Sequence, residues 1–246
     1  GSRTPLALNG ISSYTFTVTS TAATRAQDRF RLILSNTNTF TGAGNWTDAE
    51  HWSYGAVPAG SDAFVIGAGS DAVLNTDLEL TGTLTMGDGS RLTVAPGRTL
   101  TVAAGGTADF KEQSVVFKSD ATGYGSLGQV TGTLTGASNI TVERYIPNNG
   151  FRSWRLLSVP TYGTQTIRQA WQENNAPMVN GKPGYGTLIT GGGNSTAAAQ
   201  AAGFDYSGGN ASMLTWNGTG WSNISGTLAP VSAHNAYFLY VRGDRS

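Results

Sequence analysis

Short apolar and polar alternations run through the middle of the chain, and glycine-rich turns separate them. Residues 81–104 read TGTLTMGDGSRLTVAPGRTLTVAA, in which TLTM, RLTV and TLTV are joined by GDGS and APGR. Leu84, Leu92 and Leu100 therefore fall eight residues apart. An alternation with a period of two predicts β-strands. Each eight-residue step thus supplies one strand and one corner.

A longer repeat indicates how these strands are arranged. The string TGTLT at 81–85 returns at 131–135, which fits two turns of a coil of about 25 residues, a length typical of β-solenoids. Three eight-residue sides make a triangular coil, in which Leu84, Leu92 and Leu100 point inward and stack while the threonines face solvent. The alternative is an antiparallel meander with glycine-rich hairpins. The return of one side-chain register after every corner favours the solenoid.

Different patterns precede the coil. The runs ISSYTFTVT at 11–19 and DRFRLIL at 28–34 alternate well and predict a strand pair within residues 3–36, the end of a preceding β domain. A tryptophan-rich stretch follows. Because a stack of coils must cover its terminal apolar layer, Trp46 and Trp52 are expected to cap the open end of the solenoid.

The region behind the coil reads as a compact β-rich module. SMLTWNGTGWSNI at 212–224 predicts a hairpin, and NAYFLYVRGD at 235–244 predicts a final strand followed by a turn. GTQTIRQAWQ at 163–172 has helical apolar spacing, and the Gly-, Asn- and Ala-rich residues 180–210 are expected to form a long loop. Trp154 and Trp171 are expected in the core of the module.

The predicted fold is therefore all-β: a short parallel β-solenoid followed by a compact β-rich module, with an N-terminal strand pair from or near a β-sandwich. The boundaries that we expect are a tag-removal scar at 1–2, the strand pair at 3–36, the tryptophan-rich cap and solenoid at 37–147, and the module at 148–246. The chain is expected to be part of a longer protein.

Four stretches carry a resemblance to a known family: NWTDAEHWSYGAVPAGSDAFVI, LTGTLTMGDGSRLTVAPGRTLTVAAGG, ITVERYIP and SWRLLSVP. Their order is similar to that of large repetitive cell-surface and secreted proteins of the Bacteroidota, which are typically exported by the type IX secretion route. The resemblance implies a tryptophan-rich entry segment, a short β-helix and a C-terminal β module, located at the cell surface or outside the cell. It implies no defined activity and supplies no catalytic residues.

Composition narrows the classes of partner. Only 12% of the residues are charged, the formal net charge is zero, and no run of basic residues occurs, so nucleic acid is not an expected partner. No apolar stretch approaches the roughly 20 residues that span a bilayer, so membrane insertion is not expected either. The absence of cysteine excludes disulfides, thiolate metal sites and cysteine nucleophiles.

Catalytic signatures do not emerge from the sequence, and we expect no enzyme. The two histidines, His51 and His234, have no recognisable nucleophile and acid beside them, and the fifteen acidic residues are scattered singly. A β-helix lyase would need a basic and acidic cluster, for which Lys111, Glu112 and Lys118 are the nearest approach. No cofactor is expected, although Gly87-Asp88-Gly89 is a fragment of a calcium-binding pattern and leaves a structural calcium ion open.

Aromatic residues are the best candidates for ligand binding. Trp216 and Trp221 flank the NGTG turn, and Tyr206 is close in sequence. Tryptophan and tyrosine rings stack on pyranose faces, but a tryptophan pair opposed across a hairpin also stabilises it by cross-strand packing. We therefore expect a non-catalytic structural or adhesive segment of a large bacterial cell-surface or secreted protein, with an extracellular glycan or a surface protein as partner. The alternative is a carbohydrate-binding module attached to a secreted polysaccharide-degrading enzyme.

Overall fold

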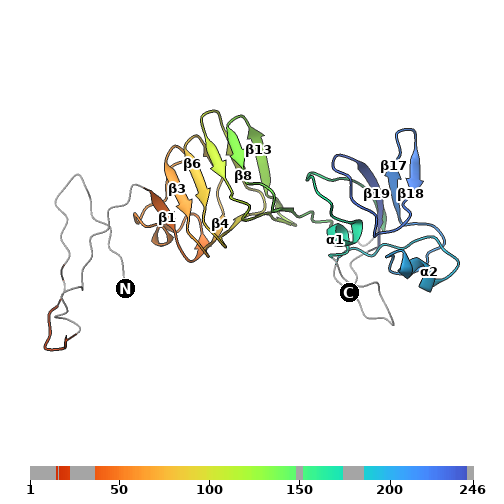
Figure 1. Ribbon diagram of the computed structural model, residues 1–246, viewed down its shortest axis with the longest axis horizontal. Coiled ribbons are helices and arrows are strands. Elements are labelled where there is room, and N and C mark those ends of the chain that lie inside the picture. The colour runs from red at the N-terminus through yellow and green to blue at the C-terminus, as the bar shows by residue number, and fades with distance from the viewer. Residues whose placement is uncertain (1–14, 16, 23–36, 148–151, 174–185, 243–246) are drawn as a thin grey trace. The chain divides into compact units, whose positions relative to one another are not determined.

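The computed structural model describes residues 15, 17–22, 37–147, 152–173 and 186–242 (Figure 1). Its contacts divide the chain into two compact units, residues 1–145 and 146–246, and each is described by itself. Most of the strand pair expected at 3–36 lies outside the described residues. Among the described residues, no helix is both long enough and apolar enough to cross a membrane.

The first unit is a parallel β-solenoid of about four turns, built from three sheets. The first sheet has the order β1 (Asn38–Phe40), β3 (Ala63–Ile66), β6 (Thr83–Met86), β9 (Thr107–Asp109) and β14 (Thr133–Thr135). The second has the order β15 (Ile140–Val142), β10 (Ser114–Phe117), β7 (Arg91–Val94), β4 (Asp71–Leu74) and β2 (Ala43–Asn45). The third has the order β13 (Ser126–Val130), β8 (Thr99–Val102) and β5 (Leu78–Leu80).

Strand pairing confirms the solenoid over the antiparallel meander. Every pairing within these three sheets is parallel, and Thr107 of β9 pairs with Thr83 on one side and Thr133 on the other. The two TGTLT strings therefore occupy equivalent places two turns apart, as the sequence predicted. Two short additions interrupt the coil: the 3₁₀ helix η2 (Ala49–His51) and the antiparallel pair of β11 (Ser119–Asp120) and β12 (Gly123–Tyr124).

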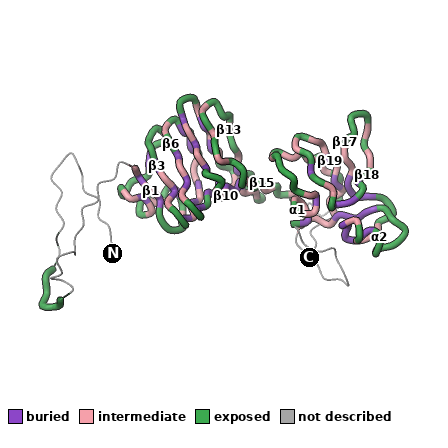
Figure 2. The backbone as a smooth tube through the Cα atoms, viewed as in Figure 1, coloured by how far each residue is buried: buried purple, intermediate pink, exposed green. Residues whose placement is uncertain are grey.

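The apolar side chains of the coil form one continuous core. Leu84, Leu92 and Leu100 have no exposed surface, but they lie on β6, β7 and β8, the three sides of one turn. Each leucine therefore stacks on residues of the neighbouring turns rather than on the other two; Leu84, for example, pairs in register with Phe64 and Ala108. Figure 2 shows buried positions alternating along these strands.

One threonine departs from the expected outward, solvated orientation. Thr93 in β7 is only 8% exposed. Val73 and Val116 lie beside it in register on the two neighbouring strands.

Trp46 and Trp52 are buried at the N-terminal end of the coil, as expected. The Trp52 ring lies 4.7 Å from Trp46 and 5.3 Å from Phe40, both edge-on, and Trp46 contacts Phe64 in the same way at 5.2 Å. The indole N–H of Trp52 donates to the carbonyl of Trp46 at 2.8 Å, so its burial leaves no unsatisfied donor.

The second unit contains a four-stranded antiparallel sheet, here called the C-terminal sheet. Its order is β16 (Ser153–Ser158), β19 (Ala236–Val241), β17 (Met213–Trp216) and β18 (Trp221–Asn223). The hairpin and the final strand predicted from the sequence are β17–β18 and β19. The expected helix is α1 (Ile167–Trp171), which begins with a capping box between Thr166 and Gln169 and buries Ile167.

The long loop expected at 180–210 is partly wrong. Residues 174–185 lie outside the described residues, but α2 (Thr196–Ala201) forms within the remainder. The hydroxyl of Ser195 caps this helix by accepting from the Ala198 N–H at 3.2 Å. A run of alanines, the strongest helix formers, explains why a helix replaces a loop here.

Candidate functional site

The two faces of the C-terminal sheet have different surroundings. Tyr237 and Leu239 in β19 face the core of the unit and are buried. The alternate residues face outward, and the register places Trp154 beside Tyr240 and Leu156 beside Phe238. Leu156 is 65% exposed, so this outer face carries apolar side chains in contact with solvent.

Five aromatic rings contact one another across this outer surface, which we call the aromatic face: Trp154, Trp216, Trp221, Phe238 and Tyr240. Phe238 lies at its centre, with ring centroids 4.9 Å from Trp154 and 5.4 Å from Trp221 and interplanar angles of 27° and 35°. Trp216 continues the row edge-on to Trp221 at 5.5 Å, and Tyr240 lies 5.2 Å from Trp154.

These ring contacts stabilise the sheet and still leave surface for a ligand. An aromatic pair contributes about 0.5–1.5 kcal/mol beyond its area burial. Trp154, Trp216 and Trp221 nevertheless each keep 41% of their surface exposed. Contiguous exposed apolar surface of this kind marks interaction sites and ligand-binding grooves.

The hairpin holds one end of the aromatic face in place. Trp216 and Trp221 are directly opposed, as the sequence predicted. The side-chain oxygen of Asn217 accepts from the backbone N–H groups of Thr219 and Gly220 at 3.0 and 2.9 Å, and Gly218 supplies a φ of +99°. The turn therefore fixes the relative position of the two indoles.

Tyr206 does not join the two tryptophans. It is half-buried, and its carbonyl accepts from the Gly191 N–H at 3.1 Å. Among the described residues, no aromatic contact links its ring to Trp216 or Trp221. Tyr206 is close to Trp216 and Trp221 in sequence, but its ring does not contact their indoles.

The sequence predicted that Trp154 and Trp171 lie in the core, and the structure confirms this for one of them. Trp171 packs edge-on against Tyr237 at 5.2 Å and belongs to the core of the second unit. Trp154 is on the outer face, so its assignment to the core was wrong. Strand alternation shows that Trp154 and Leu157, three positions apart, point to opposite faces, but it does not show which of the two faces is the core.

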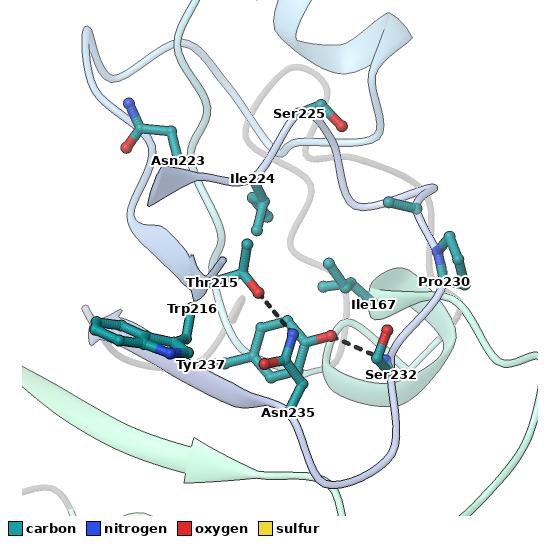
Figure 3. Close-up of a pocket in the computed structure, with 11 residues that line it drawn as sticks. Ile167, Thr215, Trp216, Asn223, Ile224, Ser225, Pro230, Ser232, Asn235 and Tyr237 are labelled. Carbon is teal, nitrogen blue, oxygen red and sulfur yellow. Dashed lines mark hydrogen bonds between the residues drawn. The ribbon is translucent and has the colours of Figure 1, made fainter. Parts of the chain in front are cut away.

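A pocket of about 370 Å³ opens beside the hairpin (Figure 3). Trp216 and Asn223 lie at its β17–β18 side. The rest of the lining mixes residues with hydroxyl or amide groups and apolar residues: Thr215, Ser225, Ser232, Asn235 and Tyr237, and Ile167, Ile224, Ala229 and Pro230. The Asn235 amide donates to the Thr215 hydroxyl at 3.0 Å, and the Ser232 N–H donates to the Tyr237 hydroxyl at 2.9 Å. Such a mixture of an aromatic ring, amides and hydroxyls suits a polar ligand with apolar faces.

A second pocket, of about 350 Å³, lies at the other end of the aromatic face. Trp154 and Tyr240 line it from the sheet, Arg242 lines it from the position directly after β19, and Gly208, Asn210, Ala211 and Ser212 line it from the segment before β17. The guanidinium carbon of Arg242 lies 5.0 Å from the centroid of the Tyr240 ring. The turn expected after this strand lies outside the described residues beyond Arg242.

The described residues hold no metal-binding cluster of three or more His, Cys, Asp or Glu side chains, and the structural calcium ion stays a prediction.

His51 contacts the Thr41 carbonyl through Nδ1 at 2.9 Å, and His234 contacts the Tyr162 hydroxyl through Nε2 at 2.8 Å. In the solenoid, hydrogen bonds from the Thr122 hydroxyl and backbone N–H lower the pKa of Asp120.

Comparisons with protein-family models, with curated proteins and with solved structures found no match to this chain. Function is therefore inferred from the chemistry of its surfaces.

Proposed function

We propose that this chain is a non-catalytic structural and adhesive segment of a large bacterial cell-surface or secreted protein. The exposed aromatic face carries the adhesive part of the proposal. Aromatic side chains are enriched where proteins bind partners, because they offer a large contact area and few rotatable bonds. The solenoid would act as a spacer, since its core is continuous and each turn supports its neighbours.

The extracellular address and the type IX secretion route are part of this proposal. Their support is the resemblance of the quoted stretches to repetitive surface proteins of the Bacteroidota. A uniform coil with short strands and glycine corners is suited to present a binding module at a distance from its point of attachment.

A second candidate is a carbohydrate-binding module attached to a secreted polysaccharide-degrading enzyme. The observation in its favour is the exposure of Trp216 and Trp221, because Trp216 also lines a pocket in which amides and hydroxyls stand beside apolar side chains. Indole rings stack on the C–H faces of pyranoses, and amides and hydroxyls bind sugar hydroxyls.

Retention on a panel of glycans and insoluble polysaccharides tests both candidates. We expect Trp216→Ala to lose retention while Tyr162→Ala keeps it. Tyr162 is the matched control, because it is an 83% exposed aromatic residue outside the aromatic face. Far-UV circular dichroism shows whether each variant is folded.

Three results would count against the proposal. Release of soluble sugar by the chain would contradict its non-catalytic nature. Absence of retention on every glycan would contradict the carbohydrate-binding candidate. If beads coated with the chain also failed to attach to any cell surface, the adhesive function itself would be wrong.

A further inference from the structure

We propose that the pocket formed by Trp154, Tyr240 and Arg242 binds a uronic acid residue, so that the partner of the aromatic face is an acidic polysaccharide. This inference rests on the proposed adhesive function and names the chemical class of its ligand. The pocket, about 350 Å³, lies within the lower part of the size range of small-ligand sites.

The first observation that supports this proposal is the environment of the Arg242 side chain. Its guanidinium carbon lies over the Tyr240 ring, 5.0 Å from the ring centroid, so the ring holds the cation beside the pocket. Its Nε is buried and has no hydrogen-bond partner among the described residues. The ion pair found among the described residues joins Lys118 to Glu143, so no described carboxylate neutralises Arg242.

A carboxylate is the ligand that this group matches best. The guanidinium is planar, permanently charged and presents its donors as a fork that fits the two oxygens of a carboxylate. Contact with the Tyr240 ring restricts the Arg242 side chain and reduces the entropy lost on binding.

The second support is the ring beside the cation. Trp154 lines the same pocket and is 41% exposed, so its indole is available to the apolar face of a pyranose. Asn210 also lines the pocket, is exposed, and offers an amide to sugar hydroxyls. The Ser212 hydroxyl is not available in this way, because it accepts from the Thr190 N–H at 2.9 Å.

The third support is the charge of this unit. Its described residues contain four arginines, Arg152, Arg155, Arg168 and Arg242, and two acids, Glu173 and Asp205. Asp205 is fully buried and accepts from the Ile189 N–H at 2.8 Å and from Gln172 at 3.2 Å. Positive charges therefore outnumber negative charges among the described residues of this unit, although the whole chain has zero net charge. This excess favours the binding of a polyanion.

The test compares polygalacturonate with the same polymer after reduction of its carboxyl groups, using calorimetry on the full chain. The two polymers share linkages and ring faces and differ in charge. We expect wild type to bind polygalacturonate at least tenfold more tightly than the reduced polymer. Arg242→Gln should weaken polygalacturonate binding by about tenfold or more, Arg242→Lys by less, and Trp154→Ala should weaken both interactions.

Arg91→Gln is the control for net charge, because Arg91 is an exposed arginine of the solenoid, and it should leave binding within about twofold of wild type. Competition by free galacturonate against galactose tests the same point on wild-type protein and needs no folded variant. Equal binding of both polymers, or equal competition by both sugars, would overturn the uronate site and leave a neutral carbohydrate partner. Absence of binding to every glycan would reject the carbohydrate partner itself.

Discussion

Leu92 shows how much of the solenoid depends on single side chains. It has no exposed surface and pairs in register with Ala72 and Val115 of the neighbouring turns. We expect Leu92→Ala to lower the free energy of unfolding by about 2–5 kcal/mol, because the lost methyl groups leave a cavity between turns. Arg91→Ala, one residue away on the exposed side, is the control. Chemical denaturation measures both, and a cost below about 0.5 kcal/mol at Leu92 would contradict its inward orientation.

Sequence alone predicted individual residues well where the pattern was local. Leu84, Leu92 and Leu100 were placed correctly because alternation within four residues fixes which side faces the core. Trp154 was not, because tryptophan suits both a core and a binding surface. Its position depends on pairing with Tyr240, which lies more than 80 residues further along the chain.

At the scale of elements, glycine at the corners of the solenoid lets the backbones of successive turns approach each other closely. The corners GAGS at 67–70 and GDGS at 87–90 lie on successive turns, and the Gly69 N–H donates to the Asp88 carbonyl at 2.9 Å. A Cβ at Gly87 would lie 2.7 Å from the Ala68 nitrogen. The backbone of the preceding turn therefore leaves no room for a side chain.

Gly87→Ala should accordingly destabilise the solenoid by about 1–3 kcal/mol, the usual cost of overpacking. The matched control is Gly220→Ala, since a Cβ there meets nothing within 4 Å and Gly220 has no positive φ. Thermal unfolding followed by circular dichroism compares the two variants. A Gly87→Ala protein as stable as the Gly220→Ala protein would show that the corners tolerate wider spacing.

The sequence predicted which residues form strands better than it predicted which face of each strand is exposed. Period-two alternation predicted the strands of the coil, and the NGTG turn predicted β17–β18. The aromatic face was only partly visible, because AYFLYV is apolar on both sides of β19 and such a run is equally typical of a fully buried strand. Only the register of β16, β19 and the hairpin shows that Trp154, Phe238 and Trp221 share one exposed surface.

At the scale of the whole molecule, the solenoid behaves as a stack of interchangeable turns. Residues 83–106 form one such turn, because Thr83 and Thr107 occupy the same place on successive turns and both follow a glycine. Removing them would bring β9 beside β3 and β10 beside β4 in the existing register, since Thr83 pairs with Ala63 and Arg91 pairs with both Asp71 and Ser114.

Deletion of residues 83–106 from the full chain should therefore leave a folded protein with lower stability, because stability in a repeat protein is close to a sum over turns and their interfaces. Far-UV circular dichroism should keep its β-sheet signal, and the near-UV signal of the buried Trp46 and Trp52 should persist. Deletion of residues 83–94 is the contrasting variant: it removes β6 and β7 but keeps β8, so β8 and the strands after it no longer fall on the sides of the coil where their partners lie, and the coil should unfold. If the 24-residue deletion unfolded the coil as completely as the 12-residue one, the turns would not be independent units, and the solenoid would not be the modular spacer that we propose.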